Sequence, residues 1–112
     1  MTSVRLNESY RLSLEAELTA LARAFVSEEL GVTECVRQLV PILRELELDH
    51  EESLIMLVGA ESDLDGFPLG PVRDHWSESA LARQDKERCK VEELYRADVL
   101  QCCRYAIEKF AQ

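Results

Sequence analysis

Hydrophobic residues recur every three or four positions along most of the chain, which is the period of an amphipathic helix. The first stripe predicts a helix over residues 8–29, which Gly31 is placed to end in a left-handed conformation. Thr33 is a suitable N-cap for a second helix, and the apolar period continues across Pro41, so we expect a kink there and not a break. The apolar positions of these two helices are Leu14, Leu18, Leu21, Ala22 and Phe25, followed by Val36, Leu39, Val40, Leu43 and Leu46.

Five consecutive apolar residues, 54–58, predict a short third helix in the centre of the fold, because they would cover most of its circumference. Asp49 and Glu52 have the spacing of a capping box, which predicts that this helix begins there. A buried β-strand is the competing interpretation, but the chain has no second strand-like run to pair with it. The pattern therefore favours an all-α fold.

Residues 62–71, S-D-L-D-G-F-P-L-G-P, are dense in Gly and Pro and predict an ordered loop. Pro71 suits the first turn of a short helix through Trp76, and Ser77 suits the N-cap of another. Charged and apolar residues then alternate with a helical period over about 85–110, which predicts a long C-terminal helix. We expect a compact bundle of about four to six helices that forms one domain over residues 1–112.

The net charge of −9 is distributed unevenly. Residues 1–72 contain 14 acidic and 5 basic residues, whereas residues 73–112 contain 8 of each. No Lys or Arg occurs from residue 45 to residue 71, although eight acidic residues do. Such a block repels nucleic acid phosphates and attracts basic proteins, so we expect a protein partner and no nucleic acid.

The remaining composition favours a cytoplasmic protein without a membrane segment. No run approaches the roughly 18 apolar residues of a membrane span, and the first ten residues lack the apolar core of a signal peptide. Cys35, Cys89, Cys102 and Cys103 show no C-x-x-C spacing, so we expect reduced thiols, most of them in the core.

The sequence gives little sign of catalytic chemistry. His50 and His75 are far apart in sequence and form no H-E-x-x-H pattern. Glu61, Asp63, Asp65 and Gly66 match the first half of a calcium loop, but its twelfth position is a valine, where a bidentate Glu is needed. We therefore expect no catalytic residue, no metal and no cofactor.

The stretch Asp65-Gly66-Phe67-Pro68-Leu69-Gly70, followed by Arg73 and Trp76, is the most distinctive part of the chain. One interpretation is structural, in which Phe67, Leu69 and Trp76 anchor a loop while Arg73 pairs with Asp63 or Asp65. The pattern, continued over residues 45–110, also resembles small acidic helical bacterial proteins encoded beside polymorphic or contact-dependent growth inhibition toxins. That resemblance implies an immunity protein, with no catalytic residues to transfer.

The leading functional hypothesis is a cytoplasmic immunity protein that is not an enzyme. It would bind a cognate toxin domain, basic and plausibly a nuclease, and block the toxin's active site. We expect a monomer. The candidate partner-binding residues are Glu45, Glu47, Asp49, Glu51, Glu52, Glu61, Asp63 and Asp65, with Phe67 and Trp76 as aromatic anchors.

Two alternatives stay open at this point. A small magnesium-dependent nucleotide hydrolase would need acidic residues converging from two facing helices, together with bases to hold phosphate. A self-associating adaptor would use the long C-terminal helix and would require an oligomer. The acidic residues available to the hydrolase are Glu47, Glu51 and Glu52, or Glu92, Glu93 and Asp98.

Overall fold

The computed structural model describes residues 7–111, which form four α-helices and one 3-10 helix. No strand occurs in this range, so the prediction of an all-α fold with a long C-terminal helix is confirmed. Within the same range no helix is both long enough and apolar enough to cross a membrane. The elements are α1 (Glu8–Val26), α2 (Val32–Glu45), α3 (Ile55–Leu64), the 3-10 helix η1 (Gly70–His75) and α4 (Glu78–Phe110).

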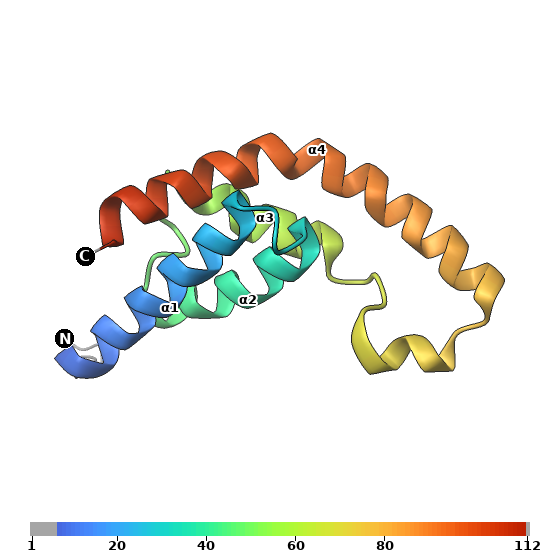
Figure 1. Ribbon diagram of the computed structural model, residues 1–112, viewed down its shortest axis with the longest axis horizontal. Coiled ribbons are helices and arrows are strands. Elements are labelled where there is room, and N and C mark those ends of the chain that lie inside the picture. The colour runs from blue at the N-terminus through green and yellow to red at the C-terminus, as the bar shows by residue number, and fades with distance from the viewer. Residues whose placement is uncertain (1–6, 112) are drawn as a thin grey trace.

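Successive α-helices run antiparallel, with α1, α2 and α3 packed beneath the C-terminal part of α4 (Figure 1). A hydrogen bond from Tyr10 to Glu45 joins the start of α1 to the end of α2. Another, from Arg37 to the Leu64 carbonyl, joins the first half of α2 to the end of α3. The result is an up-and-down bundle of four helices.

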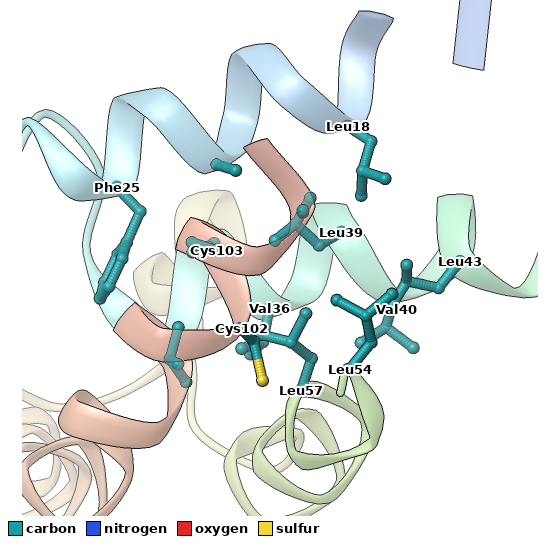
Figure 2. Packing of buried hydrophobic residues seen from close by; sticks show 14 of the residues in the cluster. Leu18, Phe25, Val36, Leu39, Val40, Leu43, Leu54, Leu57, Cys102 and Cys103 are labelled. Atoms are coloured by element: carbon teal, nitrogen blue, oxygen red, sulfur yellow. The ribbon is translucent and has the colours of Figure 1, made fainter. Parts of the chain in front are cut away.

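Helix α2 lies at the centre of the core, since it contacts α1, α3 and α4 and buries eight of its fourteen residues. Figure 2 shows Val36, Val40 and Leu43 of α2 beside Leu54 and Leu57, with Cys102 of α4 next to them. The other helices contribute one apolar face each. The predicted stripes of α1 and α2 are buried except Leu21 and Leu46, which are half-buried. Helix α2 also continues through Pro41, which is exposed.

Three of the four cysteines belong to the core, as predicted, and Cys89 is exposed. The Sγ atoms of Cys35 and Cys103 lie 3.9 Å apart. Their hydrogen bond, together with burial, raises the pKa of the Cys35 thiol. Burial raises the pKa of Cys102 to about 11. The Cys35 and Cys102 thiols therefore stay protonated at neutral pH and act as small apolar side chains.

The predicted boundary between the first two helices is wrong in its details. Gly31 has φ −77° and serves as the N-cap of α2, whereas Thr33 lies buried inside that helix. The left-handed residue that ends α1 is Glu28, with φ 62°. Its amide donates to the Phe25 carbonyl, and the next amide donates to the carbonyl of residue 24, which is the Schellman pattern.

The third helix differs from its prediction in start and in burial. It begins at Ile55, not at the predicted capping box, because residues 52–54 form turns. It is also not central: Leu54 and Leu57 are fully buried, but Ile55 is 43% exposed and Met56 is 41% exposed. Only one face of α3 meets α2 and α4, so a run of five apolar residues cannot be buried entirely.

The Gly/Pro loop is shorter than predicted, and the last helix is longer. Helix α3 extends to Leu64 and η1 begins at Gly70, which leaves 65–69 as the loop. The predicted starts of η1 near Pro71 and of the next helix after Ser77 are confirmed. That helix does not stop before residue 85 but continues to Phe110 as α4.

The N-terminal half of α4 projects beyond the bundle, and the loop and η1 return beneath it (Figure 1). We call residues 65–91 the arm. No residue from 69 to 98 is buried, and the molecule extends 49 Å along its long axis but 26 and 22 Å along the others. Phe67 and Val91 attach the two ends of the arm to the apolar core, but the residues between Leu69 and Lys90 have no buried side chain to hold them in place.

Replacing Leu57 with Ala tests the assignment of the core. The fully buried side chain leaves a cavity on truncation, so we expect Leu57→Ala to lower the free energy of unfolding by about 2–5 kcal/mol. Leu94→Ala is the matched control, since Leu94 is 78% exposed on α4 and should change stability by no more than about 0.5 kcal/mol. Urea denaturation measures both, and equal losses would contradict the assignment.

Candidate functional site

The eight acidic residues predicted to bind a partner form two groups at opposite ends of α3. The first group lies between the end of α2 and the start of α3, in residues 45–52, which we call the acidic connector. The second lies on the last turns of α3 and just beyond it. Glu61 is the seventh residue of α3, so at about 1.5 Å per residue the second group begins roughly 9 Å along the helix from its first residue. The groups are Glu45, Glu47, Asp49, Glu51 and Glu52, then Glu61, Asp63 and Asp65.

The acidic connector begins with a second Schellman motif. The Glu47 amide donates to the Arg44 carbonyl at 3.1 Å, and the Leu48 amide donates to the Leu43 carbonyl at 2.8 Å. Glu47 has φ 59°, the left-handed conformation that glycine adopts without steric cost. The fold thus holds an exposed carboxylate at a position where the backbone would favour glycine.

No carboxylate of the acidic connector is neutralised by a Lys or Arg of the described residues. Glu45 accepts a hydrogen bond from the Tyr10 hydroxyl at 2.6 Å, which raises the pKa of Tyr10. Asp49 lies 3.8 Å from His50 Nε2, and Glu51 accepts a hydrogen bond from the Ser53 amide at 3.0 Å.

Most of the ion-paired acids lie elsewhere in the bundle or in the arm. Their carboxylates lie between 2.7 and 3.9 Å from an Arg or Lys nitrogen. By contrast, no Lys or Arg of the described residues lies within ion-pair distance of a carboxylate of the connector. These paired acids are Glu8, Glu15, Glu61, Asp85, Glu87, Glu92 and Glu93.

The second group is more fully engaged by the protein itself. Glu61 lies 3.9 Å from Arg44, and Asp63 accepts a short hydrogen bond from the Tyr95 hydroxyl, which raises the pKa of Tyr95. The Asp65 side chain is exposed, with no ion pair or hydrogen bond among residues 7–111. Of this group, only Asp65 presents a carboxylate that the described residues leave unengaged.

The two predicted aromatic anchors lie away from the connector. Phe67 follows α3 and is half-buried against the core. Trp76 is 38% exposed at the turn between η1 and α4, on the arm. The ten predicted residues are therefore spread along the molecule, and the structure brings together only the five acids of the connector.

Arg37 fixes the start of the arm, a role that was not among the predictions. Its Nη2 atom lies 3.0, 3.0 and 2.6 Å from the carbonyl oxygens of Leu64, Asp65 and Phe67, to which it donates. Leu64 ends α3, so its carbonyl has no partner within the helix, and the other two carbonyls belong to the loop that follows. A long-range side-chain contact of this kind has no local sequence signature.

The arm is closed by a polar network. Arg73 donates to both carboxylate oxygens of Asp85, at 2.8 and 2.9 Å, and to the Pro68 carbonyl at 3.1 Å. The prediction that Arg73 pairs with Asp63 or Asp65 is wrong, because η1 turns Arg73 toward α4.

Further along α4, the same network reaches α2. Glu92 accepts hydrogen bonds from the amide and the hydroxyl of Thr33, at 3.2 and 2.6 Å. Arg88 connects the two ends of the network, since it lies 3.4 Å from Asp85 and 3.7 Å from Glu92. Polar contacts therefore link the arm to the first turn of α2.

Among residues 7–111, no three His, Cys, Asp or Glu side chains gather closely enough to hold a metal ion. The calcium-like run is not a loop, since residues 61–64 belong to α3. No family model, curated protein or solved structure matches the chain. The resemblance to immunity proteins therefore stays a prediction from the sequence.

Removing the Asp85 charge tests the closure of the arm. The hydrogen bond from Arg73 holds the pKa of Asp85 below its ordinary value, so the ionised form stabilises the closed arm. We expect Asp85→Asn to increase acrylamide quenching of Trp76, the only tryptophan, at neutral pH. A lowered folded-state pKa makes this stabilisation fully present above the unfolded pKa of about 3.9, and it is lost as the pH falls through the folded value.

Wild-type protein should therefore approach the quenching of the variant only in acid. Glu87→Gln is the control, because Glu87 pairs with Lys90 on an exposed part of α4 and does not touch η1. Equal quenching of wild type and Asp85→Asn at neutral pH would show that this ion pair does not hold the arm.

Proposed function

We propose that this chain is an immunity protein that binds a basic toxin domain in the cytoplasm and blocks its active site. The observation that carries the proposal is the acidic connector, in which five carboxylates within eight residues have no Lys or Arg partner among the described residues. A toxin that holds phosphate, such as a nuclease, must be basic at its active site. Carboxylates that are not neutralised internally are available to compete for that basic surface.

The left-handed conformation of Glu47 supports the same conclusion. A non-glycine residue in this region costs roughly 1–2 kcal/mol of conformational free energy. Its side chain makes no hydrogen bond or ion pair within the described chain that would offset this cost. Glu28 has the same conformation outside the acidic connector, so the strain at Glu47 supports binding only together with the unpaired carboxylates beside it.

Co-expression tests the proposal. The proposal predicts that the gene directly upstream encodes a large secreted protein whose C-terminal domain is toxic alone, and that this chain restores growth to bacteria expressing that domain. Purified chain and toxin domain should then form a complex. A non-toxic neighbour, or persistent toxicity without a complex, would contradict the proposal.

Glu47→Gly separates the contribution of this residue to binding from its contribution to stability. Glycine removes the steric cost of the left-handed conformation, but its greater loss of backbone entropy on folding costs roughly 0.5–1 kcal/mol. We therefore expect a net stabilisation of about 0.5–1 kcal/mol. Because a carboxylate is lost, the same variant should protect less well against the toxin and dissociate faster from it. Urea denaturation and the growth assay measure the two effects.

Glu28→Gly is the matched control, because Glu28 occupies the same position of the Schellman motif at the end of α1. It should gain similar stability and protect as well as wild type. If Glu47→Gly also protects fully, the acidic connector does not contact the toxin at this residue.

A further inference from the structure

A groove runs between the start of α3 and the C-terminal half of α4, directly beside the acidic connector. Its volume is about 470 Å³. Glu52 of the connector lines one side, and Asp98 and Glu108 of α4 line the other. Asp98 and Glu108 were not among the predicted partner-binding residues, because only the tertiary fold places them beside Glu52.

The charges that line this groove are not balanced. Arg104 is the one basic residue in its lining, against three carboxylates. None of these four side chains forms an ion pair or a side-chain hydrogen bond with the part of the chain that the structure describes. The groove therefore has an excess of negative charge that the protein does not neutralise.

Two other grooves on the described surface lack this excess. One, near the α1–α2 turn, is lined by Glu28 and Glu29 but also by Arg96 and Arg104. The other, between α1 and the end of α4, is lined by one acid and one base. Of these three grooves, the first is therefore the best suited by charge to a cation.

The same groove also offers apolar surface. Met56, 41% exposed, and Tyr105 both line it. A flexible methionine and an aromatic ring accommodate the aliphatic stem of a long side chain. Lys109 already lies over the Tyr105 ring, 5.9 Å from its centroid, so an incoming cation would be held mainly by the carboxylates.

We infer that this groove receives a lysine or arginine side chain of the partner protein, with its charged head at the end lined by Glu52 and Glu108 and its stem on Met56 and Tyr105. The inference rests on the proposed function and specifies where the partner inserts. An arginine or lysine matches both properties of the groove, since either has an apolar stem and a charged end.

A short acetylated and amidated peptide, with one arginine between two leucines, is the probe. Titrated into ¹⁵N-labelled full-length chain, it should shift the amide resonances of Ser53, Gln101 and Tyr105 in a saturable manner. The same peptide with citrulline in place of arginine has the same shape without the charge and should bind at least about tenfold more weakly. Equal binding of the two peptides, no binding of either, or shifts elsewhere on the bundle would overturn the inference.

Variants separate this inference from the proposed function. Glu52→Gln, Asp98→Asn and Glu108→Gln combined should abolish peptide binding and weaken protection against the toxin. Glu17→Gln, an exposed acid of α1 outside the groove, should change neither, and circular dichroism checks that each variant folds.

If the triple variant folds and protects fully, the groove is not the docking site although the proposed function stands. If wild type protects against no toxin, the proposed function itself fails.

Discussion

The burial of α2 is the constraint on which the rest of the structure depends. Its apolar residues face α1, α3 and α4, so these three helices must close around it. Eight buried residues in a helix of fourteen leave few positions for charge. The acidic residues that follow α2 are therefore placed in the connector, where the chain reverses outside the core.

Outside this core, polar contacts determine the shape of the molecule. Arg37 holds the end of α3, Arg73 and Asp85 close the arm, and Thr33 and Glu92 tie α4 to α2. Each contact satisfies groups that folding would otherwise leave without partners. Within the arm they pair Arg73 with Asp85, whereas the carboxylates of the acidic connector and of the neighbouring groove have no Lys or Arg partner among the described residues.

The apolar period of the sequence was sufficient to predict the fold class and the stripes of α1 and α2, because those helices bury one continuous face. The boundary between these helices was predicted wrongly from capping preferences. Glycine occurs at both ends of helices, so its presence did not show that Gly31 begins α2 and does not end α1. The apolar period failed for residues 54–58 because their burial depends on how many neighbours α3 meets. The acids of the connector are neighbours in the sequence and were predicted as part of one binding surface. Asp98 and Glu108 were not, because they line the same groove as Glu52 only in the folded chain.

The central claim is that carboxylates left without internal partners draw a basic protein to this surface. The association rate of the purified chain and toxin, measured by stopped flow at increasing salt, tests it most directly. Attraction between exposed charges is screened over about 10 Å at 0.1 M salt, so the rate should fall by roughly 10-fold or more as salt is raised. A rate that does not change with salt would contradict the account.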